Sequence, residues 1–267
     1  MPFEVCTLRS PRPTARPRSI LSALAALGLS AALLLCPSLS SAAPEADSPA
    51  PAAASFSPFE ALRFRTPPSF AELGPESALF RESAAQAVRR GRLLKLYLPQ
   101  HMARQYQGGR PDAVTRQVLV CGLEDQSRPL NARDAELLAR SAEGLFIGFS
   151  RIPRSHTDTP AQEEQNRAEA LRASLETGRP LLVDSLRTSA AFLHTCLVHF
   201  SMGEKKENVF LPCALATAAV PVKDTVLFVT VSSLLGQDDA APHLEWVKET
   251  ASTFADALAK ANREGKK

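Results

Sequence analysis

The sequence predicts an α+β fold, a single domain in which helices flank a mostly antiparallel sheet as in an α/β sandwich. The second half of the chain carries four stretches that resemble strands, separated by polar turns, which is typical of antiparallel pairing. The first half alternates helical and strand periodicities, and the chain ends in an amphipathic helix. Residues 59–262 contain no Pro-rich break, so we expect them to form one domain.

The first expected elements are a helix and two strands. Apolar spacing predicts the helix over 76–90. The stretch 93–98 predicts a strand, which Pro99 ends because proline lacks the amide donor of a sheet ladder. A second apolar stretch, 117–123, predicts the next strand.

A capped helix and a buried strand are expected next. Asn131 has the side chain of a helix N-cap, with Asp134 at the N3 position, and Gly144 lies where this helix would end. Residues 145–152 are apolar on both faces, which is typical of a central strand buried on both sides.

A long polar helix separates this strand from the second half of the chain. Thr159, Pro160 and Gln162 match the N-cap, N1 and N3 positions, and Gly178 would end the helix. Four strands are predicted after it, at 181–186, 192–200, 209–219 and 225–234. The final helix is predicted to pack on the core through one stripe, which comprises Leu244, Val247, Ala251, Phe254 and Leu258.

The N-terminus has the pattern of an export signal. Four arginines precede an apolar run over 20–35, and a stretch of small residues, 38–43, follows it. Cleavage after Ala42 would place Ser40 and Ala42 at the −3 and −1 positions. We therefore expect residues 1–42 to be a signal peptide, and the protein to be periplasmic or secreted.

Two other fates of this segment stay open. Cys36 could be a lipidation site, although Leu35 precedes it where a small residue is preferred. Residues 20–39 are also long enough to anchor the chain in the inner membrane if they are not cleaved. In that case the membrane contact would be made by this segment alone. Residues 43–58, rich in Pro and Ala, predict a disordered linker, and 263–267 a disordered tail.

The charge of the chain argues against a nucleic-acid partner. The formal net charge is +3, and residues 1–42 carry four Arg, one Glu and no other charged residue. The signal therefore accounts for the whole excess, and the remaining chain has a formal charge of zero. A neutral domain lacks the basic surface on which binding to nucleic acid depends.

The strands at 192–200 and 209–219 are predicted to form an antiparallel hairpin. If Phe200 lies opposite Val209, then Cys196 lies opposite Cys213 and His194 opposite Leu215. In an oxidising compartment two opposed thiols indicate a disulfide, while the alternative is a pair of small buried side chains. Cys121 lies in an apolar strand, where burial would raise the pKa of its thiol rather than activate it.

No catalytic motif is complete in the sequence, so we expect no catalytic residues, metal site or cofactor. The five histidines show no metal-ligand spacing, and no glycine loop matches a nucleotide-binding pattern. Ser155 to Asp158 predict a polar loop. Asp184 stands in an apolar strand, where it could pair with Arg187 or Arg179 or mark a cleft.

The pattern of the last third resembles that of the Mog1/PsbP/DcrB-like α/β sandwiches. A hairpin, the turn at 220–224, the strand that follows it and an amphipathic helix occur in the order found there, and residues 93–99 also fit the pattern. This resemblance implies an accessory role without catalysis. We therefore expect an exported accessory or binding protein of the bacterial envelope, with a protein partner or a small ligand. The alternative is an exported hydrolase built around Asp184, Ser185 and His194.

Overall fold

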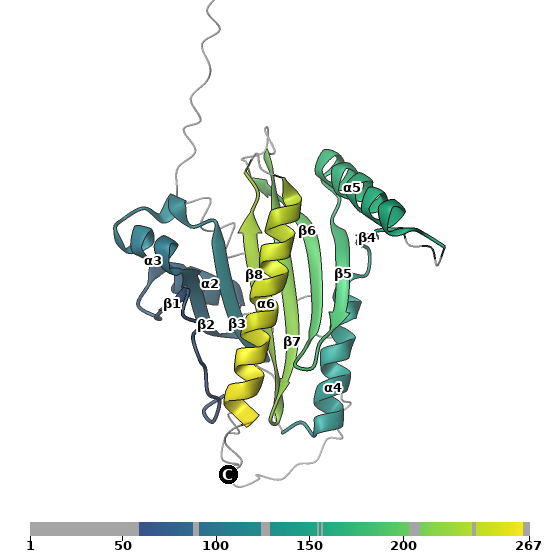
Figure 1. Ribbon diagram of the computed structural model, residues 1–267. Helices are drawn as coiled ribbons and strands as arrows, with labels where there is room; N and C mark the ends of the chain where they lie inside the picture. The colour runs from purple at the N-terminus through teal and green to yellow at the C-terminus, as the bar shows by residue number, and fades with distance from the viewer. Residues whose placement is uncertain are drawn as a thin grey trace, which may run out of the picture.

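One eight-stranded sheet organises the protein in the computed structural model, which describes residues 59–87, 91–123, 129–153, 155, 157–202, 209–236 and 239–263 (Figure 1). The strand order is β1-β2-β3-β8-β7-β6-β5-β4, and all neighbours are antiparallel except β4 and β5. The strands are β1 (Phe70–Leu73), β2 (Gly91–Pro99), β3 (Arg116–Leu123), β4 (Ser150–Arg151), β5 (Leu181–Arg187), β6 (Phe192–Met202), β7 (Val209–Val222) and β8 (Thr225–Leu234).

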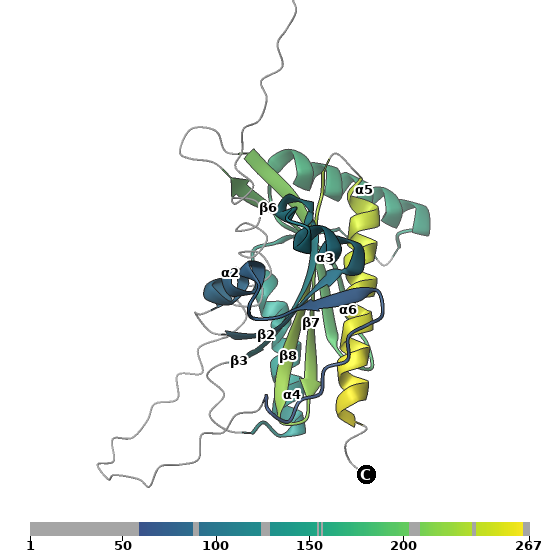
Figure 2. The same cartoon turned by 90° about the vertical axis from the view of Figure 1, so that its left-hand side faces the viewer.

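Helices lie on both faces of this sheet, as Figure 2 shows from the side. One face carries α6 (Ala240–Arg263), and α5 (Pro160–Thr177) lies on the same side near β5. The other face carries α2 (Ala78–Ala87), α3 (Gln100–Gln107) and α4 (Ala132–Ser141). The predicted α+β class, with a mostly antiparallel sheet and flanking helices, is confirmed.

Two predicted segments lie outside the described residues, the signal at 1–42 and the linker at 43–58. The C-terminal helix α6 continues to Arg263, the first residue of the predicted tail, and 264–267 are not described. Among the helices that the structure describes, none combines the length and the hydropathy needed to cross a bilayer.

The main core forms between α6 and the sheet. The predicted stripe of α6 is buried, and it packs on alternate residues of β6, β7 and β8. Phe254 meets Phe70 of β1 edge to face, with ring centroids 5.0 Å apart. Near the end of α6, the Asn262 side chain accepts from the Arg63 amide at 3.0 Å and donates to the Arg63 carbonyl at 2.9 Å. These two bonds hold the start of the domain against the end of α6.

Local capping signals predicted the start of α4 and both ends of α5 correctly, whereas α4 ends at Ser141 and not near Gly144. The Asn131 side chain accepts from the Asp134 amide at 2.8 Å and starts α4. Thr159 and Gln162 form a reciprocal capping box at the start of α5. Gly178 ends α5 at φ +66°, a left-handed conformation that glycine adopts without strain.

The prediction of a central strand over 145–152 is wrong. A 3₁₀ helix (Ala142–Phe146) continues from α4, and β4 retains only two residues, at the edge of the sheet. Gly148 interrupts the extended backbone with φ +93°, and Ile147 is 83% exposed. Phe146 packs against the α4 side of the sheet. The apolar composition of this segment therefore reflects a short helical segment that covers the sheet, not a strand.

Two short elements were not predicted, β1 and α3. A strand as short as β1 carries too few residues to show an alternation. Helix α3 is largely polar and buries only Met102 and Ala103, so its sequence shows little apolar periodicity. Pro99, predicted to end the preceding strand, occupies the N-cap position of α3.

The predicted register of the β6–β7 hairpin is wrong by two residues. Phe200 lies opposite Leu211, Cys196 opposite Leu215, and His194 opposite Thr217. Strand β6 continues to Met202, so the connection is shorter than predicted, and its residues 203–208 are not described. A shift of two keeps every side chain on its face of the sheet, so the apolar pattern fits both registers equally well.

This shift removes the direct opposition of Cys196 and Cys213. Both thiols are buried and free, on the same face but diagonal to one another. Diagonal positions are about 7–8 Å apart, beyond the usual range for a disulfide. Cys121 is a third free and buried thiol. Burial raises the pKa of Cys121 and of Cys213 to about 12 and also raises that of Cys196, so none is activated.

We expect Cys196 and Cys213 to react with iodoacetamide in guanidinium chloride without any reductant, because both are free thiols. In the native protein their burial should protect them from the reagent. Peptide mapping of the alkylated chain measures both, and Cys121, for which no disulfide partner was predicted, is the internal control. Labelling of Cys196 and Cys213 only after reduction would contradict the register described here.

Candidate functional site

Of the three residues of the predicted hydrolytic site, Asp184 lies on the opposite face of the sheet from Ser185 and His194, and a β-bulge in β5 precedes it. Leu182 lies opposite Cys196 and Asp184 opposite Thr195, so Val183 is the additional residue of the bulge. Val183 and Asp184 consequently both lie on the α6 side of the sheet, where Val183 joins the main core. The bulge therefore changes which face Asp184 occupies relative to a regular strand.

Asp184 forms an ion pair with α6. Its carboxylate is 3.1 Å from Lys248 Nζ, and both side chains are about three-quarters buried. The structural pairing predicted for Asp184 is thus present, with Lys248 as the partner. Arg187, one of the predicted partners, instead lies 2.6 Å from Glu136 of α4. Lys248 was missed because it lies on a helix distant in sequence, and nothing in the local pattern connects the two.

Ser185 and His194 come together on the opposite face. Ser185 Oγ is 3.0 Å from His194 Nδ1, and the two residues are direct partners across β5 and β6. His194 is only 4% exposed, and its ring lies 5.0 Å from that of Phe146. Desolvation by burial lowers the pKa of His194, so its ring is neutral at pH 7 and can accept the serine proton.

The expected three-residue site is nevertheless incomplete. Asp184 faces α6, whereas Ser185 and His194 face α4, so the sheet lies between the carboxylate and the imidazole. In a serine hydrolase a carboxylate orients the histidine through its second ring nitrogen. Here His194 Nε2 is buried, and none of the described residues gives it a hydrogen-bond partner. Two of the three residues are in contact, and the orienting group is missing from this contact.

His194 begins a row of buried polar side chains that crosses three strands. Thr217 of β7 lies opposite His194, and Thr230 of β8 lies opposite Thr217. Both hydroxyls are buried and have no hydrogen-bond partner within the part of the chain that the structure describes. An unsatisfied buried hydroxyl costs about 1–3 kcal/mol of stability. This row therefore weakens a sheet that is otherwise well packed.

We expect the free energy of unfolding of Thr217→Val to equal that of the unmodified protein or to exceed it by about 1 kcal/mol. The reason is that valine fills the same space without an unsatisfied hydroxyl. Thr188→Val is the matched control, since the Thr188 hydroxyl accepts from the amides of Ala190 and Ala191 at 3.2 and 3.0 Å. The control should lose about 1 kcal/mol. Urea unfolding measures both, and a Thr217→Val variant destabilised like the control would show that the hydroxyl is satisfied.

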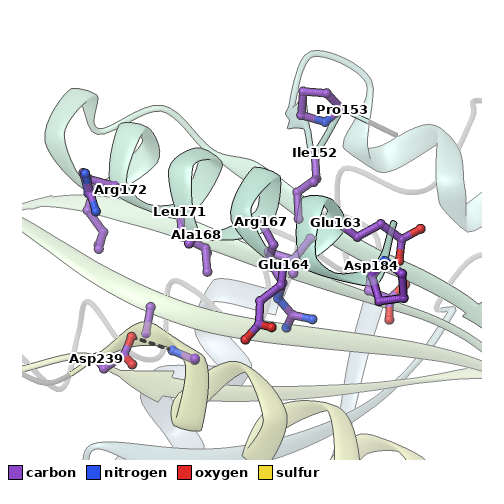
Figure 3. Close-up of a pocket in the computed structure, with 15 residues that line it drawn as sticks. Ile152, Pro153, Glu163, Glu164, Arg167, Ala168, Leu171, Arg172, Asp184 and Asp239 are labelled. Atoms are coloured by element: carbon purple, nitrogen blue, oxygen red, sulfur yellow. Dashed lines mark hydrogen bonds between the residues drawn. The ribbon is translucent and has the colours of Figure 1, made fainter. Parts of the chain in front are cut away.

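A groove lies on the other face of the sheet, beneath α5. Its volume is about 920 Å³, and it is bounded by α5, by β5 and by the start of α6 (Figure 3). Ala168 and Leu171 face it from α5, and Val183 and Asp184 line it from β5. Ala240 and Ala241 close it at the start of α6.

This groove exists because α5 packs only loosely on the domain. Leu171 and Ser174 are its only buried residues, and Leu175 is 41% exposed although it lines the groove. The polar character of the helix was evident in the sequence and was the available signal for this site. Figure 3 shows Glu164 and Arg167 extending from α5 into the gap. The groove therefore offers an apolar floor between charged walls.

The predicted polar loop over 155–158 forms hydrogen bonds within itself. In the predicted polar loop, the Ser155 amide donates to Asp158 Oδ2 at 2.8 Å and Ser155 Oγ lies 2.9 Å from Thr157 Oγ1. His156 is not described. No group of three His, Cys, Asp or Glu side chains in the described part of the chain is arranged to hold a metal ion.

No protein-family model, curated protein or solved structure matches this chain.

Proposed function

We propose that this protein is an exported accessory protein of the bacterial envelope, which binds a partner or ligand and catalyses no reaction. The observation that carries the proposal is the groove beneath α5, with its volume of about 920 Å³. The N-terminal signal pattern and the linker composition support the location. The resemblance to the Mog1/PsbP/DcrB-like proteins agrees with an accessory role.

The groove suits binding better than the polar pair on the opposite face suits catalysis. Ala168 and Leu175 of α5 are exposed in it, and burying them against a partner would be favourable. Helix α5 retains its shape without extensive packing because both of its ends are capped. It can therefore form one wall of a binding site while most of its surface stays exposed.

We expect a photo-crosslinking residue at Ala168 or Leu175 to capture a discrete adduct when the full chain is expressed in a bacterial host that exports it. Both positions line the groove. The same residue at Gln105, exposed on α3, is the control and should give no adduct. Electrophoresis and mass spectrometry detect the products.

A groove-filling variant, Ala241→Trp, should abolish these adducts, because Ala241 lines the groove at the start of α6. The proposal would be overturned by adducts that are equally abundant at Gln105, by adducts that persist in Ala241→Trp, or by no adduct at either groove position.

A second candidate function is hydrolysis, favoured by the 3.0 Å contact between Ser185 Oγ and His194 Nδ1. On the accessory proposal, a fluorophosphonate probe should not label Ser185, and p-nitrophenyl acetate should be hydrolysed no faster than by Ser185→Ala. Ser155→Ala, which removes another exposed serine, is the matched control. Stoichiometric labelling of Ser185 that is lost in His194→Ala would support the hydrolase instead.

A further inference from the structure

The groove beneath α5 continues as a trough along β5, on the α6 side of the sheet. A second cavity, of about 430 Å³, lies between Leu186 and Leu193 of the sheet and the middle of α6. A separate cavity, of about 510 Å³, lies at the end of β5, where Arg187 and Phe192 line it from the α4 side of the sheet together with Glu136 of α4. Val183, Asp184 and Leu186 occur in this order on the α6 side, so the first two cavities follow the strand and form the trough.

This trough exists because α6 covers only part of the sheet. Helix α6 packs on β6, β7 and β8, and β5 lies outside its footprint in Figure 1. A helix is about 10 Å wide, and strands are about 4.8 Å apart. A second helix packed beside α6 would therefore be centred two strands away from the strand beneath α6. Two strands from β7, in the observed order, is β5. The uncovered strip therefore has the width and direction of one additional helix.

The floor of the trough is apolar where such a helix would rest. Leu186 is 45% exposed and lies opposite Leu193, whose side chain belongs to the main core. Leu175 of α5 extends this exposed apolar surface beside the first groove, while Val183 at the base of that groove is buried in the main core. A partner would therefore need an apolar stripe facing the sheet.

The walls of the trough carry an excess of negative charge. Glu245, Glu249 and Asp256 are exposed and lie at helical spacing on the side of α6 that lines the second cavity. Together the first two cavities are lined by seven carboxylates and three cations. The carboxylates are Glu163, Glu164, Asp184, Asp239, Glu245, Glu249 and Asp256, and the cations are Arg167, Arg172 and Lys248.

We propose that the trough binds an amphipathic helix of a partner protein, with an apolar stripe on the sheet and lysine or arginine side chains beside α6. This inference rests on the proposed function and specifies the chemistry of the partner. Opposite charges along the two helices would set the orientation and raise the association rate, and the apolar stripe would supply most of the affinity. The length of β5 corresponds to about 15 residues of helix.

The experiment uses the full-length protein and two synthetic 15-residue peptides. One is an amphipathic helix of leucine, alanine and lysine, and the other has glutamate at every lysine position. By fluorescence anisotropy at low salt, we expect the lysine peptide to bind at least tenfold more tightly. A peptide of the same composition, reordered to destroy the apolar stripe, should bind at least tenfold more weakly than the lysine peptide.

Protein variants locate the binding. The triple variant E245Q/E249Q/D256N should weaken binding of the lysine peptide by about three- to tenfold, because it removes the α6 carboxylates. The control E60Q/E82Q/D112N removes three exposed carboxylates that do not line the trough, and it should leave affinity unchanged. Leu186→Ser should weaken binding without changing the preference for lysine over glutamate.

Three results would overturn this inference. They are equal binding of the lysine and glutamate peptides, equal loss of affinity in the trough and control variants, and a concentration-dependent dimer in sedimentation that Leu186→Ser abolishes. The last result would make a second copy of the chain the occupant. If Ala168 still gives its specific adduct in any of these cases, the binding function stands and only the basic helix is wrong. If no specific adduct forms there, the proposed function fails as well.

Discussion

The packing of α6 on the sheet is the interaction on which the rest of the structure depends. Its apolar stripe meets the alternate residues of three adjacent strands and forms the largest core of the domain. Because a single helix covers only two or three strands, the same packing does not extend over the end of β5, where residues 185–187 are exposed. The central core and the open trough are thus two consequences of placing one long helix across an eight-stranded sheet.

Helix α5 does not close this opening, because its sequence gives it little apolar surface to bury. Only Leu171 contributes a large buried side chain, while the ends of the helix are fixed by the Thr159 box and by Gly178. Local capping thus maintains a helix that tertiary packing would not hold by itself. The groove therefore exists because α5 is held in its helical form by its caps and not by burial against the sheet.

The sequence predicted well wherever the signal was local. The caps at Asn131 and Thr159 and the stripe of α6 depend on residues three or four apart, and the structure confirms them. The register of the β6–β7 hairpin depends on where the turn begins, and a two-residue shift preserves every face. The strand at 145–152 failed because apolar composition is shared by buried strands and by short helical segments that cover a sheet.

The candidate site was predictable only in part, for the same reason. The contact between Ser185 and His194 joins two neighbouring strands, whereas the trough depends on α5, β5 and α6, which no sequence pattern brings together.

The bulge at Val183 determines which side chains of β5 face the trough and which face His194. In a regular strand Asp184 and Ser185 would also face opposite sides, but the bulge places Val183 and Asp184 together on the α6 side.

This single additional residue therefore acts on both candidate functions. It places the Asp184 carboxylate beside Lys248 in the wall of the groove, where it contributes to the negative charge. On the other face it leaves His194 with Ser185 as its hydrogen-bond partner, and no described residue bonds to its Nε2. A charged wall over an apolar floor can recognise a partner as it stands, whereas acyl transfer would need an orienting group that this geometry keeps on the far side of the sheet. The geometry of β5 thus favours binding over catalysis.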